Sequence, residues 1–135
     1  MEKLERDIKS YGWHVLSVFE ENMPSFSYTI GFKETLDHPE IIMSGLEIDL
    51  MHQLLNDIGN LIKEGQFFSE ESISNEVLKD CPVKFVPVSQ ENTQEYFRAA
   101  NAYYGEGNFQ ILQCVWPYKN GHFPKITDEI QEVLS

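Results

Sequence analysis

The stretch "SFSYTIGFKETLDHPEIIMSG", residues 25–45, holds two apolar segments separated by polar residues. Residues 26–32 and 40–46 are rich in β-branched and aromatic side chains, which predicts two strands. Between them lies His38-Pro39, and proline disfavours a helical conformation for the residue before it, so a turn is expected there. The stretch therefore predicts a β-turn-β scaffold, in which the two glycines relieve crowding or form bulges.

Further strands are expected on both sides of this stretch. Residues 13–19 ("WHVLSVF") predict a strand that pairs with residues 26–32 as an antiparallel hairpin. Residues 83–88 ("VKFVPV") alternate in polarity, and Pro87 must lie at a sheet edge or a strand end because it has no N–H to donate. Residues 109–116 ("FQILQCVW") predict the last strand, which gives about five strands in all.

The clearest helix is predicted for residues 48–64, where apolar side chains recur at helical spacing along one stripe. Asp49 is the expected N-cap and Gly65 the expected residue just past the end. The stripe consists of Leu50, Met51, Leu54, Leu55, Ile58, Leu61 and Ile62.

Other helices carry weaker signals. A helix over residues 4–11 is expected to end at Gly12, and the segment from Asn92 to Tyr104 predicts a helix closed by Gly105. A terminal helix is expected after Thr127. The segment 66–80 is ambiguous, and a short helix carrying Ile73, Val77 and Leu78 is one interpretation of it.

The order of these elements indicates the fold class. Three strands in succession near the start favour an antiparallel or mixed sheet with helices packed on it, which is an α+β fold. A length of 135 residues is typical of one domain, so we expect a single α+β domain over residues 1–135.

Charge and composition restrict the classes of partner. The chain has 22 acidic and 10 basic residues, a net charge of −12. Because phosphate backbones and anionic membranes bind through Lys and Arg, neither nucleic acid nor a membrane is expected as a partner. A basic protein is the expected partner, because a strongly negative domain is steered towards one. The start of the sequence has no apolar signal region, and Cys81 and Cys114 form no disulfide framework, so we expect a cytoplasmic protein.

Motifs for catalysis or metal binding are missing from the sequence. The four histidines are far apart and lack the spacing of a zinc site, and the glycines form neither a nucleophile elbow nor a phosphate loop. We therefore expect no metal, no cofactor and no enzymatic activity. One alternative stays open, namely a small enzyme or ligand-binding domain with a pocket around Tyr28, His38, Glu40 and Trp116.

Seven separated segments together resemble a known family. They are "GWHVLSV", "FSYTIGF", "HPEIIMSGL", "LLNDI", "VKFVPV", "YYG" and "LQCVWPYKNGHFP". They are similar to a bacterial domain family of unknown function, number four-two-six-two, over roughly residues 11–124. By position, the matching residues are Gly12, Trp13, Phe26, Tyr28, Thr29, Gly31, His38, Pro39, Glu40, Trp116, Pro117, Phe123 and Pro124.

The resemblance implies no activity, but small acidic relatives of such domains look like immunity proteins that neutralise bacterial toxins, often basic nucleases. Together with the net charge, this favours an immunity protein that binds a cognate toxin. The partner-binding residues would be the carboxylates of the segment 70–80, namely Glu70, Glu71, Glu76 and Asp80. The two tryptophans, Trp13 and Trp116, are expected to anchor the sheet.

Overall fold

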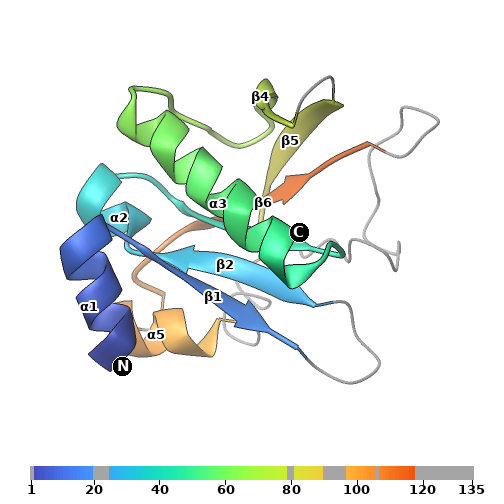
Figure 1. Ribbon diagram of the computed structural model, residues 1–135. Coiled ribbons are helices and arrows are strands. Elements are labelled where there is room, and N and C mark those ends of the chain that lie inside the picture. The colour runs from blue at the N-terminus through green and yellow to red at the C-terminus, as the bar shows by residue number, and fades with distance from the viewer. Residues whose placement is uncertain (1, 20–24, 79–80, 90–96, 106, 118–135) are drawn as a thin grey trace.

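The computed structural model describes residues 2–19, 25–78, 81–89, 97–105 and 107–117 (Figure 1). In chain order its elements are α1 (Glu2–Tyr11), β1 (His14–Val18), β2 (Phe26–Ile30), α2 (Phe32–Leu36), β3 (Glu40–Ser44), α3 (Ile48–Lys63), β4 (Ile73–Leu78), β5 (Cys81–Pro87), α5 (Arg98–Tyr104) and β6 (Ile111–Val115). The described strands form one six-stranded sheet in the order β1-β2-β3-β6-β5-β4. The α+β fold is confirmed, with one strand more than expected.

The sheet is mixed, and its one parallel pair lies at the centre. β1 and β2 form the predicted antiparallel hairpin, and β2 pairs antiparallel with β3. β3 then pairs in parallel with β6, with Glu40 opposite Ile111. This pairing brings the amino ends of β3 and β6 to the same end of the sheet, where the candidate site lies.

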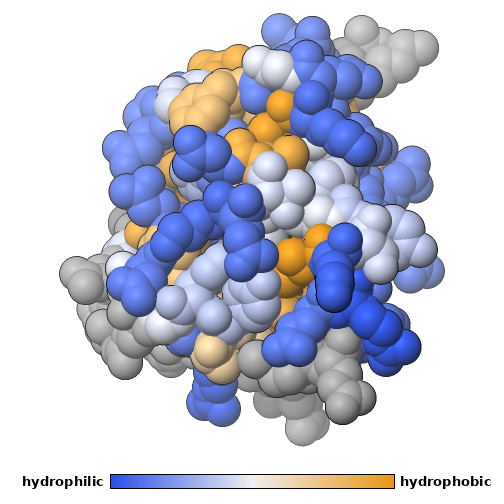
Figure 2. Space-filling model, turned by 90° about the vertical axis from the view of Figure 1, so that its left-hand side faces the viewer, coloured by the Kyte–Doolittle hydropathy of each residue, from blue (hydrophilic) through white to orange (hydrophobic). Residues whose placement is uncertain are grey.

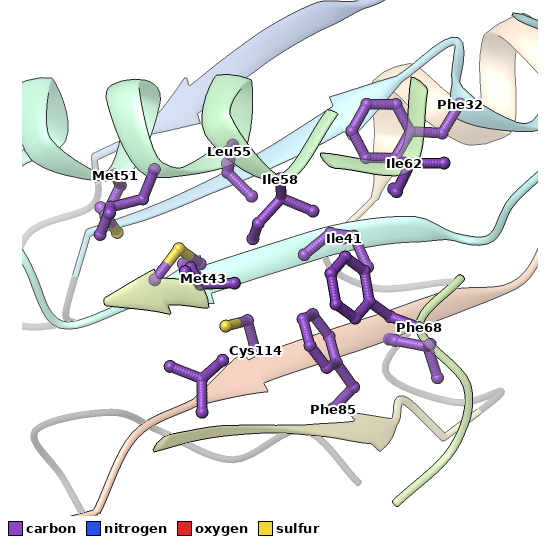
Figure 3. Close-up of a cluster of buried hydrophobic side chains, with 14 of the residues drawn as sticks. Phe32, Ile41, Met43, Met51, Leu55, Ile58, Ile62, Phe68, Phe85 and Cys114 are labelled. Atoms are coloured by element: carbon purple, nitrogen blue, oxygen red, sulfur yellow. The ribbon is translucent and has the colours of Figure 1, made fainter. Parts of the chain in front are cut away.

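Helices cover both faces of the sheet. α3 crosses one face, where its buried side chains meet Ile41 and Met43 of β3 and Phe85 of β5 (Figure 3). On the other face, α1 and α5 pack against Tyr28 and Ile42. Because successive side chains of a strand point to opposite faces, neighbours such as Ile41 and Ile42 belong to different cores.

The structure differs from the sequence analysis at two places. The segment 73–78, for which a short helix was one interpretation, is strand β4, because β5 offers it an antiparallel partner. Of its apolar residues only Val77 is buried, and Ile73 is 58% exposed. The turn expected before His38 contains the short helix α2, which begins after Gly31. Helices expected from Asn92 and Thr127 start in residues outside the described ranges, although α5 confirms the second half of the first.

The ends of α3 differ in how well they follow prediction. Gly65 follows the last turn with a φ of 113°, as expected for a residue just past a helix. At the other end, Glu47 takes the N-cap position without a side-chain cap, and Asp49 lies in the first turn, where its charge favours the positive end of the helix dipole. Leu50, predicted to lie in the apolar stripe, is 40% exposed.

Gly31 is a glycine that the packing requires. Its φ is 119°, and a Cβ there would lie 2.7 Å from the carbonyl oxygen of Gly12 and 2.8 Å from Cα of Trp13. The residue therefore relieves crowding, as predicted, where the end of β2 passes close to the start of β1.

Both tryptophans pack against the core on the α3 side. The Trp13 indole meets the ring of Phe32 edge-on, with 5.4 Å between centroids, and its Nε1–H donates to Asn56 Oδ1 at 2.9 Å. Gly59 lies directly under this ring, because a Cβ at Gly59 would be 2.6 Å from Cζ2 of Trp13. The absence of a side chain at Gly59 thus allows the indole to lie flat on α3.

Gly59→Ala should therefore destabilise the protein. Alanine favours a helix over glycine by about 1 kcal/mol, but overpacking costs about 1–3 kcal/mol and the indole is held on two sides. We expect a net loss of about 1–2 kcal/mol in the free energy of unfolding, measured by urea denaturation. Gln53→Ala, on the exposed face of the same helix, should cause no loss. In a Trp13→Phe background the cost of Gly59→Ala should disappear; if it persists, the indole is not its cause.

Candidate functional site

A fully buried carboxylate, Glu40, links two strands and two helices at the amino end of β3. Its Oε1 accepts hydrogen bonds from Thr29 Oγ1 at 2.9 Å and from the Phe32 amide at 3.1 Å. Its Oε2 accepts from the Lys33 amide at 3.0 Å and from the Tyr104 hydroxyl at 2.7 Å. The two amides belong to the first turn of α2, so Glu40 caps this helix from the neighbouring strand.

The surroundings of Glu40 consist of donors. Burial raises the pKa of its carboxyl, and the four hydrogen bonds counteract only part of that rise. Thr29 Oγ1 and the Tyr104 hydroxyl themselves accept from the amides of Ile41 and Gly31, which leaves their protons directed at the carboxylate. The pKa of Tyr104 is raised chiefly by burial and, as the next largest cause, by the nearby charge of Glu40. This closed arrangement suits a structural cap rather than a group that exchanges protons with a substrate.

Tyr28 has a comparable role on β2. Its side chain is 1% exposed, and its ring meets that of Phe97 edge-on at 4.8 Å. Its hydroxyl interacts with the backbone of Ala99 and Ala100 in the first turn of α5, a helix without a side-chain cap of its own. Burial, the largest effect, raises the pKa of Tyr28 to about 12. A neutral hydroxyl therefore caps α5 from the sheet.

His38 is a buried, neutral link between two loops. Its Nδ1–H donates to the carbonyl of Pro39 at 2.8 Å, and its Nε2 accepts from the Phe68 amide at 3.0 Å. That second bond requires an unprotonated Nε2, which agrees with the pKa of His38, lowered chiefly by burial. One edge of the ring reaches Phe67, with 4.7 Å between centroids.

The structure does not bring the four residues of the alternative pocket together. Tyr28 belongs to the core under α1 and α5, whereas Trp116 packs against the core under α3, on the opposite face. Glu40 is saturated with hydrogen bonds inside the protein. Of these four residues, His38 lines a cavity at the amino end of β3.

That cavity is one half of a groove at the amino ends of β3 and β6. Two adjoining cavities of about 490 Å³ and 480 Å³ share five lining residues, namely Pro39, Phe67, Gly107, Phe109 and Gln110. Lys33 and Asp37 lie at one end, and Glu70 at the other. Phe67 is common to both halves, and its aromatic side chain is 63% exposed. We call this feature the Phe67 groove.

The four carboxylates predicted to bind a partner are dispersed. Glu70 lines the Phe67 groove, whereas Glu71 forms an ion pair with Lys84 at 2.7 Å. Glu76 projects from edge strand β4 and accepts a hydrogen bond from Gln66. Asp80 lies outside the described residues. A charge on an edge strand also opposes unwanted pairing with other strands, which gives Glu76 a structural role of its own.

Sequence reasoning missed Phe67 and Tyr104. A signal for Phe67 was present: two adjacent phenylalanines followed by a polar segment. In an extended backbone neighbouring side chains point in opposite directions, so the two rings are expected on opposite sides of the chain, and the polar residues that follow favour solvent on one of these sides. Tyr104 lies in the segment "YYG" of the family resemblance, but nothing in the sequence joined it to Glu40, which is 64 residues away.

The described residues contain no group of three or more His, Cys, Asp or Glu side chains that could hold a metal ion, and none of the described helices has the length and hydrophobicity of a membrane span.

Glu40→Gln should destabilise the fold. An amide oxygen replaces only one of the two carboxylate oxygens, and the new NH₂ group faces donors, so about two hydrogen bonds are lost. We expect a loss of about 2–4 kcal/mol, since bonds to a charged group are the stronger ones. Denaturant unfolding measures it. Glu34→Gln is the matched control, because Glu34 is exposed and also accepts from a tyrosine hydroxyl. An equally small effect, within about 0.5 kcal/mol, for both variants would contradict the capping role.

The lowered pKa of His38 predicts a loss of stability in mild acid. As the pH falls below about 6.5, the unfolded chain takes up a proton that the folded state binds only at lower pH. The free energy of unfolding should fall by up to about 1.4 kcal/mol per pH unit in that window. His38→Gln has no imidazole to titrate, so its free energy of unfolding should depend less on pH. Phe67→Leu is the control: it removes a neighbouring ring but keeps His38, so the pH dependence should remain. An unchanged profile in His38→Gln contradicts the assignment.

Comparison with known proteins supplies the family. No curated protein and no solved structure matches the chain. A family model does, over residues 7–128, and its description is "Domain of unknown function (DUF4262)". The match covers nearly the whole chain, including the hairpin, the Glu40 network and the Phe67 groove. The chain belongs to this family of domains of unknown function.

Proposed function

We propose that this chain is an interaction protein that binds a basic protein partner at the Phe67 groove. The observation that carries the proposal is the exposed Phe67, placed in a groove with the carboxylates of Asp37 and Glu70 at its two ends. An aromatic anchor flanked by charge is a common centre of binding energy at protein interfaces.

The overall charge supports a basic partner. With a net charge of −12, the protein attracts a positive surface over distances up to the Debye length, about 8 Å at physiological salt. Lys33 adds one positive charge at the Asp37 end of the groove, which is small against the net charge of the chain, and its ammonium group bonds to the carbonyl of Asn108 and lies over the ring of Tyr104. The basic side chain of the groove is therefore already engaged within the protein.

The biological role that fits such binding best is that of an immunity protein in the bacterial cytoplasm. A nuclease toxin presents a basic active site to its nucleic acid, and an acidic protein with an aromatic anchor can cover that site. Inhibition would then be steric and electrostatic, with no chemical step. The buried, hydrogen-bonded state of Tyr28, His38 and Glu40 favours this role over an enzymatic one.

Co-expression with a basic, toxin-like product encoded next to the gene tests the role. The chain should restore growth of cells that make the toxin. Phe67→Ala should abolish protection and raise the dissociation constant by roughly 30-fold or more, as for a hot-spot residue. Glu70→Lys should slow association and reduce its dependence on salt, both measured by stopped-flow mixing.

Asp57→Lys is the matched control, because Asp57 is exposed on α3 and undergoes the same change of charge. It should protect cells as the original chain does. If Asp57→Lys slows association as much as Glu70→Lys, the attraction is diffuse and the groove is not the interface. A chain that protects no cells from any adjacent toxin-like product is not an immunity protein.

A further inference from the structure

A third cavity, separate from the Phe67 groove, lies beside edge strand β1. Its volume is about 510 Å³, within the range of small-ligand sites, which is about 300–1,000 Å³. Its wall includes residues 13–15, together with side chains from α1 and α3. Figure 2 views the molecule from the side on which α1 lies, and hydrophilic residues dominate that face, with smaller apolar areas between them. We call this cavity the β1 cavity.

The charge of the β1 cavity is opposite to that of the whole chain. Two lysines, Lys3 and Lys63, line it against one carboxylate, Asp7, and His14 and His52 add imidazoles. The chain has 22 acidic residues and only 10 lysines and arginines, so a site with more basic than acidic groups is a departure from its composition. The local potential therefore favours an anion.

The basic groups of the β1 cavity are available to a ligand. Lys3 and Lys63 form no ion pair within the described residues, and both are exposed. The one carboxylate is occupied, because Asp7 Oδ2 lies 2.7 Å from His14 Nδ1. This contact orients the imidazole of His14 and leaves its Nε2 for another partner.

Aromatic and amide groups complete the lining. Tyr11 is 74% exposed at the end of α1, and Trp13 is held in place by its hydrogen bond to Asn56 Oδ1. The Asn56 amide nitrogen and the Asn60 side chain add donors. A fixed indole and an exposed phenol offer flat surfaces to a ring, and ammonium and amide groups offer donors to phosphate oxygens.

We propose that the β1 cavity binds a small ligand that carries a phosphate group and a flat ring, the chemical class of nucleoside monophosphates. Lys3 and Lys63 neutralise the phosphate, and the aromatic side chains contact the ring. A single small anion needs few basic groups, so this site is compatible with a chain whose net charge disfavours binding of a long nucleic acid. The proposal is independent of the protein partner proposed above, since the two sites share no lining residue.

Titration of the isotope-labelled full chain, followed by amide chemical shifts, tests the proposal with AMP as the probe. AMP should shift the amides of residues 11–15 and 52–63 in a saturable manner. The double variant Lys3→Glu/Lys63→Glu should weaken binding by roughly tenfold or more, because it removes both charge-assisted contacts. Asn60→Asp, which adds a negative charge without a change in size, should also weaken it.

Lys9→Glu is the matched control, because Lys9 is exposed on α1 but does not line the β1 cavity. It should leave binding of AMP within about twofold of the original value. Inorganic phosphate and adenosine are the other two probes. Adenosine that binds as tightly as AMP overturns anion recognition, and phosphate that binds as tightly overturns the role of the ring. An absence of saturable shifts with AMP, or equal loss in Lys9→Glu, overturns the site.

Discussion

The buried carboxylate of Glu40 holds this fold together at the point where the sheet changes from antiparallel to parallel pairing. It lies at the first residue of β3, and its four hydrogen bonds come from β2, from the start of α2 and from the end of α5. Burying a charge is costly, and the cost is met only where every oxygen is satisfied. The positions of α2 and α5 relative to the sheet are therefore coupled to one side chain.

Helix capping by the sheet recurs in this protein. Neither α2 nor α5 carries a side-chain cap of its own, and both are too short to be stable alone in water. Glu40 and Tyr28, from adjacent strands, supply acceptors for their first amides. This gives the buried polar residues of the opening stretch a structural role: they replace the caps that the helices lack.

The two proposed binding surfaces use different parts of this framework. The Phe67 groove is formed where β3 and β6 begin together, and His38 fixes the position of its aromatic wall through the Phe68 amide. The β1 cavity lies beside edge strand β1 and is lined by side chains of α1 and α3. The Phe67 groove presents an aromatic side chain between carboxylates, and the β1 cavity presents ammonium groups. Their ligands should therefore differ in charge and should not compete.

By itself, the sequence determined the local features of this protein: the hairpin of β1 and β2, the long helix α3 and the α+β class. Each rests on contacts between residues close in the chain, which periodicity reveals. The sequence also indicated that residues 25–45 are scaffold, and it gives the chain its negative charge. The tertiary structure alone decided that residues 73–78 are a strand, because the partner strand β5 overrides their helical spacing. It alone joined Glu40 to Tyr104 and decided that Phe67, rather than Phe68, is exposed. Both outcomes depend on which distant segments meet, and that is selected by burial and hydrogen-bond saturation rather than by local propensity.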